Sequence, residues 1–448
     1  MVTMSLTAIL DDSKLSPVQW VAIIICISLN ALDGFDVLAI SFASPGIAAE
    51  WGINRAELGV VLAMELVGMA FGSIFLGGVA DKFGRKPTIQ FCLVLMTAGM
   101  FGAAFVDSVM TLLIIRFITG LGIGGMLAST NAMVSEFANK KSRNLCVIIM
   151  ATGYPIGAVL GGSIASMLLE THTWRAVFIF GGSITGLFML VVAFWLPESL
   201  LYMVNHPKEN TLDKVNHMLA SMKKPLLDAL PAPAVSAKKS SYSTLFSPEM
   251  RKLTLLLMVA YFAQIMTFYF ILKWIPKIVV DMGFGAAQAG QVLVWANLGG
   301  AVGAILLGLL TSKLNLRLTM IPVLILAFVM VSVFGIGYSD LGTLALVSAA
   351  TGFFTNAGVV GLYGLMAQAF PANVRASGTG VVIGIGRGGA ALSPVVAGLL
   401  FTNGVSLQGV AIAMGTGALV ATLAIYFLNN KQGGRGTATH SSLSAVTK

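Results

Sequence analysis

The chain contains 448 residues, of which 57% are hydrophobic and only 10% are charged. Soluble domains carry roughly 25% charged residues, so this composition excludes a water-soluble enzyme, a disordered chain and a secreted disulfide-linked domain. The formal net charge of +9 suits the basic cytoplasmic loops of a membrane protein, and no nucleic-acid partner is expected. We therefore expect an all-α integral membrane protein, because helices satisfy their own backbone hydrogen bonds in lipid.

Twelve apolar segments are long enough to cross a bilayer, which takes about 20 helical residues. In chain order they span residues 20–42, 56–80, 88–106, 109–134, 145–169, 176–196, 253–275, 289–310, 320–338, 341–366, 376–400 and 407–428. One long hydrophilic break separates six segments from six. This spacing predicts an N-terminal segment (1–19), a six-helix bundle (20–196), a central loop (197–252), a second six-helix bundle (253–428) and a disordered tail (429–448).

The basic residues indicate the orientation. With the N-terminus inside, 21 of the 27 Lys and Arg residues fall on cytoplasmic loops and tails. Only Arg55, Arg175, Lys273 and Lys277 fall on the outer side. Because loops rich in Lys and Arg stay in the cytoplasm, we expect both termini and the central loop to be cytoplasmic.

Five charged residues lie inside the expected spans. They are Asp33, Asp36, Glu65, Arg116 and Arg387. A charge at the centre of a bilayer costs at least about 2.5–3.5 kcal/mol, so each needs a partner, a water-filled cavity or a function. Asp33 and Asp36 are three residues apart and therefore share one face of the first span.

Depth suggests how these charges could pair. At about 1.5 Å per residue, Asp33 and Arg387 lie about 20 and 18 Å above the inner ends of their spans. Asp36 and Arg116 lie about 9 and 10 Å below the outer ends of theirs. Matching depth permits both pairs without proving them, and Glu65 is either a second proton site or a locally paired group.

The loop between the second and third spans reads Gly77-Gly-Val-Ala-Asp81-Lys-Phe-Gly84-Arg85-Lys86. The matching loop of the second half, residues 308–317, is a degraded copy in the same register. The chain here resembles the major facilitator superfamily, whose signature loop is G-x-x-x-D-R-x-G-R-K/R; Arg116 begins the family's R-x-x-x-G motif. The resemblance implies two six-helix bundles and alternating access.

The signature loop predicts a gate. Asp81 and Arg85, with Gly84 between them, are placed to latch the two bundles when the inner side is closed. Glu136 and Glu198, at the inner ends of their spans, fit the same charge network. Simple surface pairing, worth under about 1 kcal/mol for each pair, is the alternative.

The stretch Asp33-Gly-Phe-Asp36 narrows the resemblance to the aromatic acid:proton symporters of bacteria. The resemblance implies that both aspartates are required for transport and that Arg116 is the arginine of the fourth span. A buried carboxyl group can bind a proton, and an arginine can bind the carboxylate of the substrate, so Arg387 or Arg116 is the expected counter-ion. A pair that only fixes helix packing is the alternative.

Uncharged side chains could line the substrate site. The aromatic candidates that could stack on a ring are Phe35, Tyr269, Trp295 and Tyr363, and the amide candidates are Asn297 and Asn356. No cofactor and no metal site are expected, and a monomer suffices. Taken singly, each candidate is more readily explained as a residue that faces lipid or the helix core.

These features predict a carrier, not an enzyme, that imports an aromatic carboxylate with protons across a bacterial inner membrane. The sequence leaves open muconate-like or other non-aromatic acids as the substrate. Proton-coupled efflux is the rival within transport.

Overall fold

The computed structural model describes residues 6–11, 13–231, 242–311, 313–371 and 374–428, and these residues form helices and connecting turns without strands. Twelve of the helices are long and apolar enough to cross a membrane, as predicted. The first six are α2 (Pro17–Trp51), α3 (Arg55–Phe83), α4 (Arg85–Ala104), α5 (Val109–Phe137), α6 (Arg143–Thr171) and α7 (Arg175–Trp195). The other six are α11 (Arg251–Asp281), α12 (Ala286–Thr311), α13 (Leu316–Phe334), α14 (Leu341–Ala369), α15 (Arg375–Thr402) and α16 (Leu407–Tyr426).

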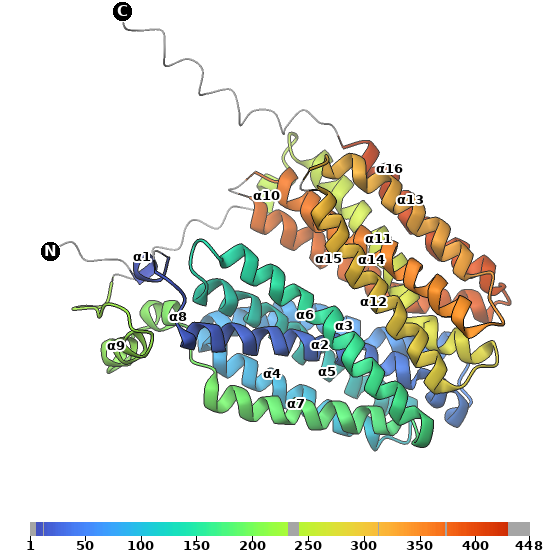
Figure 1. Ribbon diagram of the computed structural model, residues 1–448, viewed down its shortest axis with the longest axis horizontal. Helices are drawn as coiled ribbons and strands as arrows, with labels where there is room; N and C mark the ends of the chain where they lie inside the picture. Colours follow the sequence, from blue (N-terminus) through green and yellow to red (C-terminus); the bar gives the residue numbers. More distant parts are fainter. Residues whose placement is uncertain (1–5, 12, 232–241, 312, 372–373, 429–448) are drawn as a thin grey trace, which may run out of the picture.

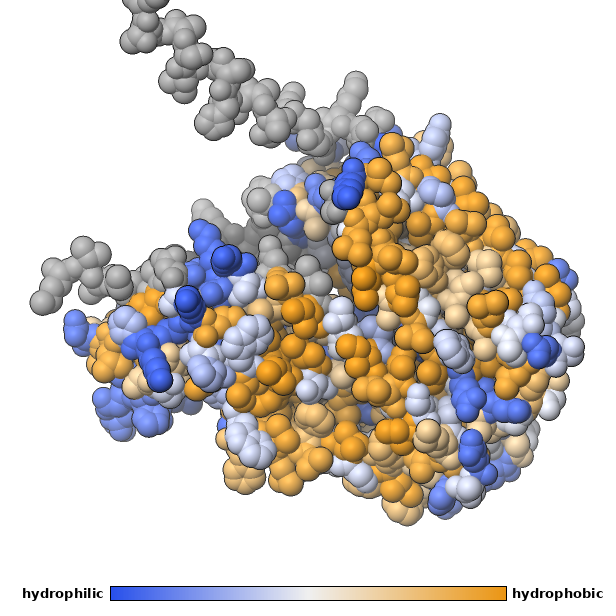
Figure 2. Space-filling view, in the orientation of Figure 1, coloured by the Kyte–Doolittle hydropathy of each residue, from blue (hydrophilic) through white to orange (hydrophobic). Residues whose placement is uncertain are grey.

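The spanning helices form two bundles of six that meet along one side (Figure 1). We call the end where α2 begins and α16 ends the inner end, and the opposite end the outer end. Apolar side chains cover the middle of both bundles, and hydrophilic side chains collect at the two ends (Figure 2). This distribution is the one that a protein surrounded by lipid requires.

Four short helices lie between or before the spans: α1 (Leu6–Asp11), α8 (Leu200–Asn205), α9 (Thr211–Ser221) and α10 (Tyr242–Leu245). Helices α1, α8 and α9 lie together at the inner end of the first bundle (Figure 1). Within its described residues, the predicted central loop thus contains the short helices α8, α9 and α10. The predicted disordered tail, residues 429–448, lies outside the described residues.

Several helix ends differ from the expected spans because the helices continue past the apolar segments. Helix α2 continues through Pro45 to Trp51, nine residues beyond the predicted end, where Gly52 closes it in a left-handed conformation (φ 61°). Helix α11 continues through Pro276 to Asp281. Proline is tolerated inside membrane helices because neighbouring groups satisfy the carbonyl that it frees. The depths expected from the shorter spans are therefore too shallow for Asp36.

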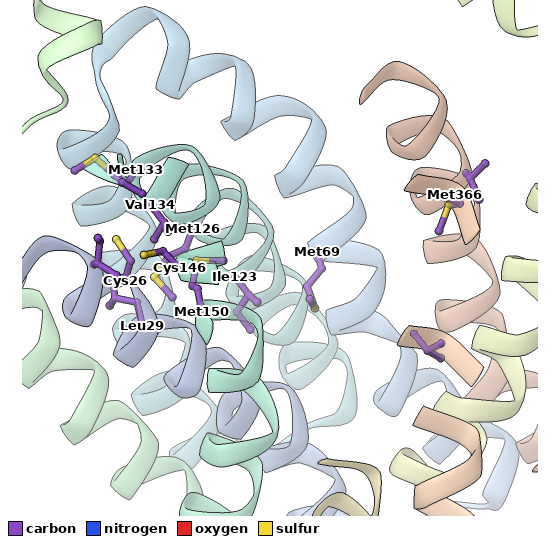
Figure 3. Packing of buried hydrophobic residues seen from close by; sticks show 14 of the residues in the cluster. Cys26, Leu29, Met69, Ile123, Met126, Met133, Val134, Cys146, Met150 and Met366 are labelled. Atoms are coloured by element: carbon purple, nitrogen blue, oxygen red, sulfur yellow. The ribbon is translucent and has the colours of Figure 1, made fainter. Parts of the chain in front are cut away.

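The interior of the first bundle is rich in sulfur. Cys26 of α2 and Cys146 of α6 meet Met126, Met133 and Met150 between α2, α5 and α6 (Figure 3). Methionine adapts its shape to irregular gaps, which suits a bundle whose helices approach at several angles. The three cysteines of the chain, which include Cys92, are buried and unpaired, as expected for small core residues.

Candidate functional site

Glycines bring α3 and α5 into backbone contact at the centre of the first bundle. A Cβ on Gly68 would collide with the backbone of Phe117, and one on Gly120 would collide with the backbone of Glu65. Small residues spaced four apart allow this close approach, because no side chain separates the two backbones. The crossing places Glu65 and Arg116, each about one turn from it, opposite each other.

Arg116 and Glu65 form a fully buried ion pair between Nη2 and Oε1. The other carboxylate oxygen of Glu65, Oε2, lies 3.7 Å from Nζ of Lys273, which comes from α11 in the second bundle and is also fully buried. One carboxylate thus faces two cations, and one of those cations comes from the opposite bundle. The central polar group is therefore shared between the two halves.

The remaining contacts of Arg116 hold its guanidinium in place. Nη2 lies 3.2 Å from the backbone oxygen of Asp36, Nη1 lies 3.3 Å from Sδ of Met100, and the group lies 5.3 Å from the ring of Phe178. The suggested pairing of Arg116 with the carboxylate of Asp36 is wrong. Glu65 takes that place because the glycine crossing between α3 and α5 sets the neighbour of Arg116.

The two aspartates of α2 are buried, with 2% of Asp33 and 0% of Asp36 exposed. The hydroxyl of Thr185 on α7 lies 3.3 Å from Oδ2 of Asp36. Among the described residues, both carboxyl oxygens of Asp33 and the Oδ1 atom of Asp36 lack a hydrogen-bond partner. An unpartnered buried carboxyl group is expensive unless it is protonated, which makes both aspartates sites where a proton can be held.

Arg387 of α15 lies where the two bundles meet. Its Nη1 donates a 2.9 Å hydrogen bond to the carbonyl of Met69 on α3, and the electrostatic influence of Arg387 reaches Asp33. No ion pair joins Arg387 to Asp33 among the described residues. The two residues, which were expected at the same depth, are therefore close to each other but not directly paired. Within the described part of the chain, Met69 is the one hydrogen-bond partner of Arg387.

Two tyrosines of α11, Tyr261 and Tyr269, lie within electrostatic reach of Arg387. The hydroxyls of Tyr261 on α11 and Tyr363 on α14 lie 2.9 Å apart, and the ring of Tyr261 fills the space where Gly386 has no side chain. Tyr269 lies within electrostatic reach of Arg387 and of Tyr154, which comes from α6 in the first bundle. Tyrosines from both bundles therefore lie at the junction, and the two that are near Arg387 both come from α11.

Three residues of this centre were not among the expected site residues: Lys273, Tyr261 and Tyr154. Lys273 was expected on the outer side, which is wrong. Its expected span stopped at residue 275, but α11 continues six residues further, which draws the lysine inward. The sequence did carry a signal for this position. Lys273 lies one helical turn before Pro276 and two turns before Asp281, so a helix that continues to Asp281 places the lysine inside the span.

Other expected contacts lie away from the centre. Phe35 packs inside the first bundle, 5.4 Å from Phe180 and against Gly161 and Gly181, so its ring fills space between α2, α6 and α7. Trp295 is 50% exposed on the apolar outer face of α12. It shares this face with Leu298, Val302, Leu306 and Leu309. Neither side chain faces the central charges, because the rotation of each helix about its own axis places Phe35 inside the first bundle and Trp295 on the surface.

The two asparagines stabilise helix packing. Nδ2 of Asn356 donates a 2.8 Å hydrogen bond to the carbonyl of Gly300 across the contact of α14 with α12. Nδ2 of Asn297 donates a 2.9 Å bond to the carbonyl of Leu293 on its own helix. Both amide groups thus have protein partners, and the bond of Asn356 ties α14 to α12.

The signature loop forms a charge network at the inner end of the first bundle. Nη1 of Arg85 lies 2.6 Å from Asp81, and Nη2 lies 3.2 Å from Glu136. Oε1 of Glu198 accepts hydrogen bonds from the backbone N–H groups of Arg85, Lys86 and Ser199 at 3.0, 3.2 and 2.8 Å. Glu198 therefore caps α4, and burial raises its pKa although these hydrogen bonds oppose the rise.

The bundles touch at the outer end, where α3 packs against α15. Along the antiparallel contact of α3 with α15, a Cβ on Gly59 would meet the backbone of Pro394, and one on Gly398 would meet the backbone of Arg55. The structure is therefore closed on the outer side, where these two helices are in backbone contact.

Comparison with known proteins gives consistent matches. The family model of the Major Facilitator Superfamily matches residues 26–337 and 257–446. The chain is 29% identical over 426 residues to a 4-hydroxybenzoate transporter, PcaK, of Acinetobacter baylyi, covering 94% of this chain and 93% of that one. It is 27% identical to a gallate transporter of Pseudomonas putida, covering 93% of each chain. The xylose transporter XylE from E. coli, solved in a partially occluded inward-open conformation, matches with a TM-score of 0.72 at 14% identity, covering 92% of this chain and 98% of that one.

Proposed function

The chain belongs to the Major Facilitator Superfamily, and we propose that it imports an aromatic carboxylate together with protons across a bacterial inner membrane, with both termini in the cytoplasm. The observation that carries this proposal is the buried centre. Two carboxyl groups without ion-pair partners among the described residues lie in it: Asp33 is near Arg387, and Asp36 is near Arg116. The transport of aromatic acids by relatives of similar length supports the substrate class.

Co-transport of a proton offsets the electrical work of moving an anion into the cell. An inside-negative potential opposes anion entry by about 2.3 kcal/mol per charge per 100 mV, and a co-transported proton removes that penalty. Asp33 suits this task because neither of its oxygens has a protein partner among the described residues. A proton on Asp33 leaves Arg387 free to attract the substrate, and loss of that proton toward the inside restores the attraction between aspartate and arginine.

Of the two arginines, Arg387 is the better substrate ligand. The guanidinium of Arg116 is already held by Glu65, Asp36 and Met100. Arg387 contacts one carbonyl of the protein among the described residues, so its remaining N–H groups can hold a carboxylate with two parallel hydrogen bonds. The tyrosines around it supply aromatic edges for the ring of the substrate and hydroxyls for ring substituents.

Alternating access requires the inner end to close in turn. In this outer-closed structure the side chain of Asp81 is 73% exposed and pairs with Arg85 of the same bundle. We propose that the loop with Asp81, Gly84 and Arg85, joined to Glu136 and Glu198, latches the bundles when the inner end closes. The ion pair of Asp81 with Arg85 inside the first bundle would then be replaced by an ion pair between the two bundles.

Replacing Asp33 with Asn tests the proposal. Purified protein in liposomes is given an inward proton gradient and radiolabelled 4-hydroxybenzoate, and uptake is measured with time. At −100 mV, uncoupled anion entry is opposed by about 50-fold, whereas coupled uptake with one pH unit should accumulate the acid about tenfold. Asp33→Asn and Asp36→Asn should each abolish accumulation.

The matched control is Asp340→Asn, which makes the same chemical change at an exposed helix cap outside the spans. It should accumulate the acid like the parent, because asparagine caps helices as well as aspartate. Undiminished proton-driven accumulation in both span variants would refute the proposal, and outward transport driven by the same gradient would support efflux instead.

A further inference from the structure

Lys273 is the charged side chain by which the second bundle reaches into the first. It is fully buried in α11, and its Nζ contacts the carbonyl of Val37 on α2 and lies 3.7 Å from Oε2 of Glu65 on α3. Val37 follows Asp36 directly toward the outer end. Lys273 itself lies eight residues, about 12 Å, from the outer end of its helix at Asp281. The lysine therefore lies on the outer side of the aspartates.

The two oxygens of Glu65 have different partners. Oε1 faces Arg116, which belongs to the same bundle, and Oε2 faces Lys273, which belongs to the other. When the outer end opens, α11 must move away from α2 and α3, so the pair with Arg116 persists and the pair with Lys273 breaks. The geometry makes the second pair depend on the conformation of the carrier.

A second ion pair between the bundles is weaker. Arg55 of α3 lies 2.9 Å from Asp281 of α11 at the outer end, with side chains 43% and 29% exposed. Exposed pairs contribute at most about 1 kcal/mol, whereas breaking a buried pair leaves an uncompensated charge. The outer closure therefore depends more on Lys273 than on Arg55.

We propose that the buried ion pair of Glu65 with Lys273 is a lock that keeps the outer end closed. Without the negative charge of Glu65, the buried ammonium group of Lys273 is left near Arg116, a like charge, so removing either partner of the pair weakens the contact of α11 with α2 and α3.

Several titratable groups face Glu65 and share its electrostatic environment. They are Asp33 and Asp36 of α2, Arg116 of α5, Tyr154 of α6, and Tyr269 and Lys273 of α11. The lock is measured without substrate and without a proton gradient, so its test is independent of the proposed function.

The test follows the accessibility of a cysteine in the closed outer contact. The native Cys26, Cys92 and Cys146 are first replaced with alanine. The reporter is Ala63→Cys, which is buried one turn inward of Gly59 on α3. Right-side-out vesicles are treated with a membrane-impermeant thiol reagent, and each rate is divided by that of Asp107→Cys, whose side chain is 97% exposed.

Lys273→Met and Glu65→Gln should each raise the relative labelling rate roughly fivefold or more. The matched control is Lys277→Met, which removes a lysine one turn further out whose partner, Asp281, lies on its own helix. That control should label at the parent rate, and Lys273→Arg should restore slow labelling and thereby show that the fold is intact. Parent-like labelling of Lys273→Met would overturn the proposal.

If Lys273→Met labels at the parent rate while proton-driven uptake is intact, the lock is overturned and the proposed function is not. If Lys273→Met labels fast while proton-driven uptake is absent, the proposed function is overturned and the lock is not.

Discussion

Replacing Gly84 with alanine should destabilise the inner end of the first bundle. Gly84 joins α3 to α4 with φ at 112°, a region that residues with a Cβ rarely adopt. The new methyl group would also collide with the carboxylate of Glu198, which accepts hydrogen bonds from the first N–H groups of α4. One substitution therefore strains the backbone and displaces a helix cap.

The structure allows the cost to be estimated. Backbone strain of this kind costs about 1–3 kcal/mol, and loss of a helix cap costs about 1–2 kcal/mol. Together they predict a loss of about 2–5 kcal/mol in the free energy of unfolding. In a chain of this size, that corresponds to a melting temperature lower by roughly 2–5 °C.

The assay is thermal unfolding of the purified protein in detergent, followed by tryptophan fluorescence. The control is Gly78→Ala on the preceding helix, where the backbone is helical and a Cβ meets nothing within 4 Å. It should be neutral or stabilising by up to about 1 kcal/mol, because alanine favours helix. Equal melting temperatures for Gly84→Ala and the parent would refute the reasoning.

Two further predictions concern Glu198 and Arg387. Because burial holds the folded pKa of Glu198 above its ordinary 4.5, ionisation costs stability, and the parent should lose stability as pH rises from 4.5 through the folded pKa. Glu198→Gln keeps the acceptor oxygen without the charge. The melting temperature of this variant, relative to that of the parent, should therefore rise between pH 4.5 and 8, and a difference that does not change with pH would contradict this. Arg387→Lys should raise the half-saturating concentration for uptake about tenfold, because lysine lacks the planar fork that binds a carboxylate; an unchanged value would remove Arg387 from the substrate site.

Much of the architecture could be predicted because hydropathy is a local property. Each apolar segment must form a helix in lipid whatever its neighbours are, so twelve spans in two bundles follow from the sequence and agree with the structure. The helix ends were less predictable. Apolar composition stops near residue 42 in α2 and near residue 275 in α11, but both helices continue past it through a proline.

The same sequence identified the charges that deserve a function, since an ionised group in lipid is costly wherever the chain folds. It could not choose their partners. Arg116 meets Glu65, and not the carboxylate of Asp36, because glycines of α3 and α5 bring two backbones together at one particular angle. Depth along a helix follows from counting residues, but rotation about its axis does not.

Rotation and packing also decided which residues leave or join the centre. Trp295 faces outward on α12, and Lys273, expected outside, is buried against the opposite bundle. The sequence by itself determined how many helices cross the membrane and which of them carry charge, because those properties depend on composition along each segment. Only the tertiary structure decided which charges meet, because contacts between distant segments depend on where small residues let the helices approach.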